Sequence, residues 1–219
     1  MTRQEVHARI EEIGIIPSVR LSSAEDAMFA AEAVREGGIP IVEVTMTIPG
    51  AIDVIRELAR NSETLVVGAG SIWDVEVAAR CLDAGARFLT STGFDRGIVE
   101  FAQKHDTVVF PGTLTPSEVM AAWKAGVDFV KIFPCANVGG PSYIKALRRP
   151  FPQIRMIAGG GVNQQNAGEF ILQGATAIGV GADLIQPQAI KRREASWIQE
   201  LAGRFVHMVQ QARDRREGH

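Results

Sequence analysis

One pattern repeats along the whole chain and constrains its fold more than any other feature. A short apolar run, often rich in β-branched residues, is followed by an amphipathic helical stretch, then by glycine, then by the next apolar run. The runs predict eight strands, at residues 15–19, 41–44, 65–69, 88–90, 107–110, 129–133, 155–158 and 177–180. The stretches between them predict helices at residues 24–36, 51–60, 75–83, 98–104, 117–124 and 167–172.

The ends of these helices carry their own signals. Glycines come just past four of the predicted helices, at Gly37-Gly38, Gly85, Gly126 and Gly174, where a residue with positive φ commonly ends a helix. At the other end, Pro116 falls in the first turn of its helix, the position that best tolerates proline. The boundaries are therefore readable without any structure.

Strands that alternate with helices form parallel sheets with helical crossovers. Eight such units in about 200 residues match the size of a small TIM barrel. The rival is an open doubly wound sheet, but the first strand-helix turn lacks the G-x-G-x-x-G fingerprint. We therefore predict an α/β protein, a (β/α)8 TIM barrel with an N-terminal helix. It should form one domain over residues 1–219, with the barrel at about 15–190 and a C-terminal helix at about 194–215.

Charge and composition argue against several kinds of partner. The net charge is -2, and the one basic run, at residues 213–216, is interrupted by Asp214, which indicates a solvated helix end rather than a nucleic-acid site. No apolar run reaches the roughly 18 residues of a membrane span. Cys81 and Cys135 lie in no CxxC or disulfide-like pattern. We expect a cytoplasmic protein with neither a nucleic-acid nor a membrane partner.

Lys131 stands inside the sixth predicted strand, with apolar neighbours on both sides. Lysine is rarely buried without a partner or a task. It could form a structural ion pair, or extend its charged end to water. Burial also lowers the pKa of an ammonium group, which is how a lysine becomes a nucleophile near neutral pH. Its place in a barrel strand favours a catalytic role.

Glu43 stands in the second predicted strand in the same kind of setting. A buried carboxylate needs a partner, and Lys131 and Arg20 are the cations on offer at the strand ends. Glu43 and Lys131 could form a purely structural pair. A lysine nucleophile beside a carboxylate that moves protons is also what imine chemistry requires. Spacing alone does not decide between these roles.

Glycine-rich loops follow the seventh and eighth strands, as Ala158-Gly-Gly-Gly-Val-Asn163 and Gly179-Val-Gly-Ala-Asp183. The glycines could serve only tight turns. Two such loops at these places, each leading into a helix, are typical of a barrel phosphate site built from backbone N–H groups.

The four histidines (7, 105, 207 and 219) are remote from the strand ends, and no cluster has metal-ligand spacing. We therefore expect chemistry that needs neither metal nor cofactor.

Taken together, these motifs resemble the 2-keto-3-deoxy-6-phosphogluconate (KDPG) / 4-hydroxy-2-oxoglutarate (KHG) aldolase family. Gly126-Val-Asp-Phe-Val-Lys131-Ile-Phe-Pro-Cys-Ala-Asn-Val-Gly139 resembles the family's lysine signature, and Gly38-Ile-Pro-Ile-Val-Glu43-Val-Thr its glutamate signature. Val67-Gly-Ala-Gly-Ser71, Phe110-Pro-Gly112 and both glycine loops also match in order and spacing. The resemblance implies a homotrimeric TIM barrel and a metal-free class I aldolase that releases pyruvate and an aldehyde, either glyceraldehyde 3-phosphate or glyoxylate.

The resemblance also implies roles for individual residues. Lys131 would form the imine, and Glu43 would move protons through a water. Ser71 would contact the pyruvyl carboxylate in place of a threonine. Backbone N–H groups would hold the phosphate, at Gly160, Gly161, Gly181 and Ala182.

The chain departs from the family pattern around the substrate. Thr47 stands where a carboxylate-binding arginine is expected, Thr92 replaces a proline, Gly159 a threonine and Ala182 a serine. A neutral threonine cannot make the two-pronged contact of an arginine, and Arg20 could supply the missing cation. The run that begins at Val19 and Arg20 resembles the branch that acts on the 6-phosphogalactonate epimer, which is the first alternative substrate.

Two alternatives lie outside this class of enzyme. One is a phosphosugar isomerase or epimerase on the same barrel, with Glu43 as base and Lys131 as its electrostatic partner. The other is a non-catalytic, ligand-binding descendant of the family.

Overall fold

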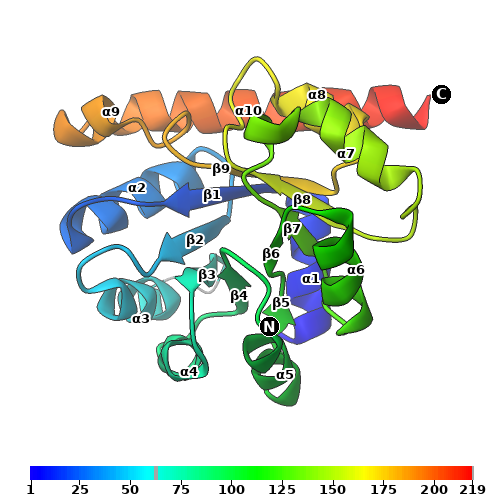
Figure 1. The fold of residues 1–219 in the computed structure, drawn as a ribbon. Helices are drawn as coiled ribbons and strands as arrows, with labels where there is room; N and C mark the ends of the chain where they lie inside the picture. Colours follow the sequence, from blue (N-terminus) through cyan, green and yellow to red (C-terminus); the bar gives the residue numbers. More distant parts are fainter. Residues whose placement is uncertain (62–63, 219) are drawn as a thin grey trace.

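The strands form a closed barrel in the computed structural model, which describes residues 1–61 and 64–218 (Figure 1). The strand pairs are all parallel, and the sheet runs in the order β5-β4-β3-β2-β1-β9-β8-β7-β6. The strands are β1 (Ile15–Val19), β2 (Ile41–Thr45), β3 (Val66–Ile72), β4 (Phe88–Ser91), β5 (Val108–Val109), β6 (Gly112–Thr113), β7 (Val130–Ile132), β8 (Met156–Gly159) and β9 (Ala177–Val180).

The two ends of this sheet, β5 and β6, belong to one stretch of chain and so close the barrel. On one side, the amide of Phe110 donates to the carbonyl of Leu89 in β4; on the other, the amide of Lys131 donates to the carbonyl of Pro111. Proline has no N–H to continue a ladder, so the stretch divides at Phe110-Pro111. The barrel prediction is confirmed. The predicted fifth strand at 107–110 was wrong in its bounds, because pairing resumes after the proline.

The predicted helices are present, with bounds within two residues of those expected. They are α2 (Ala24–Glu36), α3 (Ala51–Asn61), α4 (Val75–Asp83), α5 (Arg96–Lys104), α6 (Pro116–Lys124), α8 (Ala167–Leu172), the N-terminal α1 (Arg3–Ile13) and the C-terminal α10 (Ala195–Glu217). The structure adds α7 (Pro141–Arg148), α9 (Pro187–Lys191) and the short 3-10 helix η1 (Ala136–Val138). The side chains of Ser23 and Thr115 cap the helices α2 and α6 at their amino-terminal ends.

Aromatic rings pack inside the barrel toward the amino-terminal ends of the strands. Phe88 and Phe110 stack with their ring centroids 5.3 Å apart, and Phe129 meets Phe110 edge to face. A side chain on Gly68 would collide with the Phe88 ring, so glycine makes room for this cluster. The rings form a buried apolar layer beneath the carboxyl ends of the strands.

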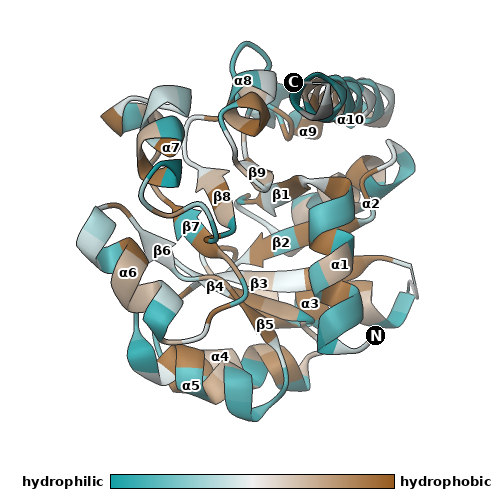
Figure 2. Cartoon of the chain, turned by 90° about the vertical axis from the view of Figure 1, so that its right-hand side faces the viewer, coloured by the Kyte–Doolittle hydropathy of each residue, from teal (hydrophilic) through white to brown (hydrophobic). Residues whose placement is uncertain are grey.

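Helices cover the outside and the amino-terminal end of the barrel. The helix α10 packs along α8 and α2, while α1 lies across the amino-terminal end, where His7 stacks on Phe129. Figure 2 views this end, with apolar strands inside and polar helix surfaces outside. Within the described part of the chain, no helix is both long and apolar enough to cross a membrane.

Candidate active site

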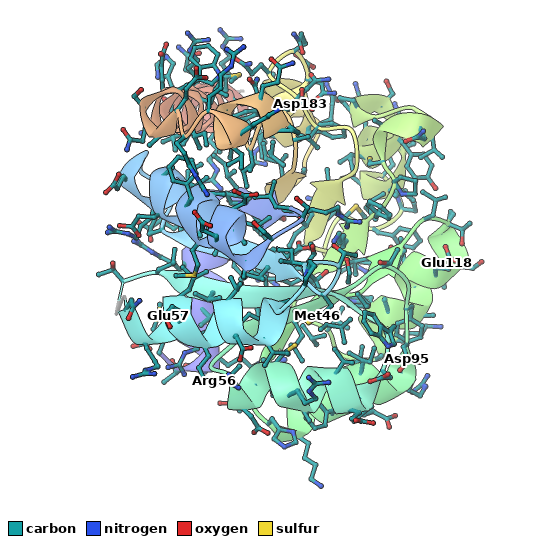
Figure 3. The ribbon with its side chains drawn as sticks, turned by 90° about the vertical axis from the view of Figure 1, so that its left-hand side faces the viewer. Met46, Arg56, Glu57, Asp95, Glu118 and Asp183 are labelled. Atoms are coloured by element: carbon teal, nitrogen blue, oxygen red, sulfur yellow. The ribbon has the colours of Figure 1, made fainter. Side chains whose placement is uncertain are left out.

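The carboxyl ends of the strands open on one face of the molecule, which we call the barrel mouth. Figure 3 looks onto it and labels Met46, Asp95 and Asp183, which follow β2, β4 and β9. A cavity of about 330 Å³ lies there. The predicted site residues that line it are Arg20, Glu43, Ser71, Thr92, Lys131, Gly159, Gly160, Gly161, Gly181 and Ala182.

Lys131 and Glu43 meet inside this cavity. The Nζ of Lys131 lies 3.7 Å from the Oε2 of Glu43, and their side chains are only 14% and 5% exposed. A buried carboxylate and a nearly buried ammonium at this distance compensate each other's loss of water. The predicted partnership between the two side chains is therefore present in the fold.

Neighbouring residues fix the carboxylate of Glu43. Ser18 is the register partner of Glu43 in β1, and its hydroxyl donates to the Oε1 at 3.2 Å. Gly70, on the other side in β3, leaves the space that the carboxylate fills: a Cβ there would stand 2.0 Å from the same oxygen. Glu43 is thus held between a hydrogen-bond donor and a glycine, and points toward Lys131.

The other neighbours of the Lys131 side chain are uncharged. Its Nζ lies 3.5 Å from the hydroxyl of Thr90 and 5.5 Å from the ring centre of Phe133. The Thr90 hydroxyl donates to the carbonyl of Phe110, so its oxygen faces the amine as an acceptor. Gly159 lies beside the lysine stem, where a Cβ would come within 3.3 Å of Cε. These long contacts restrain the amine only weakly, and it lines the open cavity.

Arg20 and Ser71 form a second polar group at the mouth. The guanidinium of Arg20 donates to the Ser71 hydroxyl at 3.3 Å. Ser71 lies at a bulge between β3 and β4 and has a φ of 58°, a conformation that costs a non-glycine residue free energy. The bulge turns this hydroxyl toward Arg20, so that one cation and one hydroxyl face the same space.

Thr47 lies in a neighbouring cavity rather than in the one that holds Lys131. That cavity, of about 430 Å³, shares Arg20, Ser71 and Thr92 with the first. The Thr47 hydroxyl is 2.8 Å from the hydroxyl of Thr45. Thr47 therefore borders the predicted site but does not line the cavity of Lys131.

The two glycine loops, which follow β8 and β9, form one side of the main cavity. Gly160 and Gly161 have φ values of 84° and 79°. A Cβ on Gly161 would come within 2.4 Å of the Cβ of Ala136, and one on Gly160 within 2.9 Å of the backbone of Pro134. Close packing thus explains these glycines in part. Asp183 also lines this side, which places a carboxylate beside the expected anion site.

Six lining or contacting residues were not assigned to the site from the sequence: Ser18, Thr90, Phe133, Val162, Gly179 and Asp183. Ser18 and Thr90 are polar residues inside apolar strands, the same signal that singled out Glu43. Asp183 stands two residues after Gly181, within a loop that the sequence had already marked.

Among the side chains that the structure describes, in residues 1–61, 64–216 and 218, no three of His, Cys, Asp or Glu gather closely enough to hold a metal ion. Cys135 is buried, and burial raises the pKa of its thiol to about 12. Its thiol is therefore protonated at neutral pH and packs as a small apolar group.

Comparisons with known proteins point in one direction. The family model described as KDPG and KHG aldolase matches residues 6–201. A 2-dehydro-3-deoxy-phosphogluconate aldolase of Treponema pallidum (strain Nichols) is 30% identical over 200 residues, which cover 91% of this chain and 95% of the relative.

Solved structures agree with these sequences. KDPG aldolase from Legionella pneumophila, with pyruvate captured at low pH as a covalent carbinolamine intermediate, is 32% identical with a TM-score of 0.84, over 90% of this chain and 96% of that one. A structure described as native KDPGal is 25% identical with a TM-score of 0.84, over 91% and 96% of the two chains.

Proposed function

This chain belongs to the KDPG and KHG aldolase family and is an aldolase, and on that premise we propose that Lys131 is its imine-forming nucleophile. The observation that carries the proposal is the contact between Lys131 and Glu43 in a cavity at the barrel mouth. A covalent pyruvate carbinolamine was captured in the Legionella relative, which supports the same chemistry here. The substrate would be a 2-keto-3-deoxy-6-phospho sugar acid or 4-hydroxy-2-oxoglutarate.

The proposed reaction begins with addition of the neutral Lys131 amine to the C2 carbonyl of the substrate. Loss of water from the carbinolamine gives an iminium ion. Glu43, acting through a water, would deliver the proton that makes the hydroxyl a leaving group. The carboxylate lies 3.7 Å from the amine, close enough to serve the same nitrogen and carbon throughout the cycle.

Cleavage then uses the iminium as an electron sink. A base takes the proton of the C4 hydroxyl as the C3–C4 bond breaks; the electron pair of that bond moves into the iminium to form an enamine, and the aldehyde leaves. Protonation at C3 and hydrolysis of the imine return pyruvate and free lysine. Glu43 is the carboxylate beside Lys131 that would carry these protons. No step requires a metal ion or a cofactor.

We propose that Arg20 and Ser71 bind the substrate carboxylate. Arg20 is the other cation that lines the cavity, and its contact with Ser71 places both groups at one side. This pairing compensates for Thr47, which carries no charge, while Thr92 and Gly159 shape the remaining wall. Backbone N–H groups of Gly160, Gly161, Gly181 and Ala182 would hold the phosphate at the loops after β8 and β9.

Other properties follow from family membership as proposals. We propose that residues 1–219 form one domain, that the chain assembles into a homotrimer, and that it works in the cytoplasm. The free, buried Cys81 and Cys135 suit a reducing compartment.

The choice of substrate is tested by kinetics. We propose comparing kcat/KM for the phosphogluconate-derived and phosphogalactonate-derived keto acids and for unphosphorylated 4-hydroxy-2-oxoglutarate. A higher value for either phosphorylated compound supports the anion site at the glycine loops. Equal values with and without phosphate would remove that assignment but leave the imine chemistry intact.

A further inference from the structure

A second cavity, of about 570 Å³, lies at the opposite end of the barrel. Its walls include Glu11 at the end of α1, Arg155 just before β8 and Thr176 just before β9, so it opens at the amino-terminal end of the strands, the end that faces the viewer in Figure 2. Four arginines line it: Arg148, Arg155, Arg213 and Arg216. The chain as a whole carries a net charge of -2, so this concentration of positive charge is local.

One carboxylate, that of Glu11, is present among the described residues that line the cavity. Arg155 forms an ion pair with this carboxylate, and its Nε lies 2.6 Å from the Oε1 of Glu11. Neither Arg148 nor Arg216 forms an ion pair with any carboxylate in residues 1–61 and 64–216. The two guanidinium groups therefore keep their full positive charge.

Backbone carbonyls hold both side chains in place. The Nη1 of Arg148 donates to the carbonyl of Ile154 at 2.9 Å, and the Nη1 of Arg216 donates to that of Ile171 at 3.3 Å. The stem of Arg148 lies against Gly174, where a Cβ would stand only 3.0 Å from its Cγ. Carbonyl groups orient a guanidinium without neutralising it, and each guanidinium has five N–H donors in all.

Arg148 and Arg216 also act on one another. Burial, and then the charge of Arg216, lower the pKa of the Arg148 guanidinium. Two like charges that are fixed toward one hollow repel each other unless an anion lies between them. An anion between them would relieve this repulsion, so the cavity favours a negatively charged partner.

We propose that this cavity binds a small polyanion with the charge and size of a diphosphate, gripped between Arg148 and Arg216. Guanidinium forks match phosphate oxygens in pairs, and the volume lies within the usual range for small-ligand sites. No aromatic side chain is present among the described lining residues, so the site offers no platform for a stacked base. Recognition rests on the phosphate groups.

The test uses inorganic pyrophosphate and the full chain, by calorimetry at constant ionic strength. In R148Q/R216Q, pyrophosphate affinity at this site should fall by about tenfold or more, because two charge-assisted contacts are lost. The matched control is K145Q/R215Q, which removes the same charge from the exposed faces of α7 and α10. Any pyrophosphate bound at the barrel mouth is common to all three proteins and cancels in the comparison.

A second measurement needs no variant. Phenylglyoxal modifies accessible arginines, and peptide mapping reports each position. Pyrophosphate should slow modification of Arg148 and Arg216 several-fold while leaving Arg215 unchanged. Equal affinity in R148Q/R216Q and the control, or no protection of Arg148 and Arg216, would overturn the proposal. Neither result bears on the aldolase activity, which is assayed separately in the same proteins.

Discussion

The Nζ of Lys131 lies 3.7 Å from the Oε2 of Glu43, and this pair is held by residues of three other strands. Ser18 comes from β1, Gly70 from β3 and Thr90 from β4. An ion pair with a purely structural role would not require an open cavity beside the amine. The pair and its cavity are the basis of the proposed lysine chemistry, and each part of that proposal has its own test.

Glu43→Gln tests whether the reaction needs the carboxylate at this position. The amide keeps the shape of the carboxylate but cannot take a proton, so kcat should fall by about 10²–10⁴-fold. The measurement is kcat for cleavage, with Glu57→Gln on the outer face of α3 as the matched control. Activity near that of the control would remove Glu43 from the proton-transfer steps.

Gly70→Ala tests the position of the carboxylate without changing its chemistry. The added methyl group would stand 2.0 Å from the Oε1 of Glu43, so the carboxylate must move. A displacement of about 1 Å can cost about a hundredfold in rate, and kcat should fall by that order. Gly203→Ala in α10, which meets no atom within 4 Å, is the control. If Gly70→Ala retained full activity in a folded protein, the geometry of Glu43 would be irrelevant.

We expect Asp183 to oppose the binding of a phosphate at the glycine loops, because its carboxylate lines the same cavity. Removing one like charge near an exposed site is worth about 1 kcal/mol, so Asp183→Asn should raise kcat/KM for a phosphorylated substrate about fivefold. The value for unphosphorylated 4-hydroxy-2-oxoglutarate should stay the same. Asp53→Asn, on α3, controls for a change of net charge alone. Equal effects on both substrates would mean that Asp183 does not face the phosphate.

The two cysteines should resist alkylation in the folded protein. Burial raises the pKa of Cys81 and of Cys135 to about 12, above the ordinary 9.0, and the thiolate is the reactive form. Native protein in iodoacetamide at pH 8 should show no adduct by mass spectrometry, whereas protein unfolded in guanidinium should show two. Rapid labelling of native Cys135 would contradict its protonated, packed state.

The same shift predicts how stability depends on pH. A thiol that ionises at a higher pH when folded favours unfolding once the unfolded thiols begin to ionise. These groups therefore stabilise the fold fully below pH 9 and lose that contribution between about pH 9 and 12. Replacing both cysteines by alanine should flatten the fall of unfolding free energy over this range.

Much of the barrel was predictable because periodicity and caps are local signals. The bounds of β1, α2 and α4 match the sequence expectation, since Ser23 and the glycines after helices fix the ends. The fifth strand was misjudged because Pro111 interrupts it while its neighbours continue the pairing on both sides. That pairing depends on contacts between distant parts of the chain, so no periodic pattern in the sequence reveals it.

The candidate site was predictable where a polar residue broke an apolar strand, as at Lys131 and Glu43. It was less predictable where backbone geometry decides. The left-handed conformation of Ser71, which turns its hydroxyl toward Arg20, arises from a bulge that the sequence does not announce. The place of Thr47 in a neighbouring cavity likewise depends on how the loop after β2 bends.

The imine itself provides the most direct test of the account. Incubation with pyruvate and borohydride should reduce the imine to a stable secondary amine on Lys131, seen by peptide mass spectrometry as one adduct at that residue. Lys131→Met should give no adduct and no cleavage, whereas Lys124→Met, on the outer helix α6, should give both. Absence of an adduct on Lys131, under conditions that trap a control aldolase, would contradict the central claim.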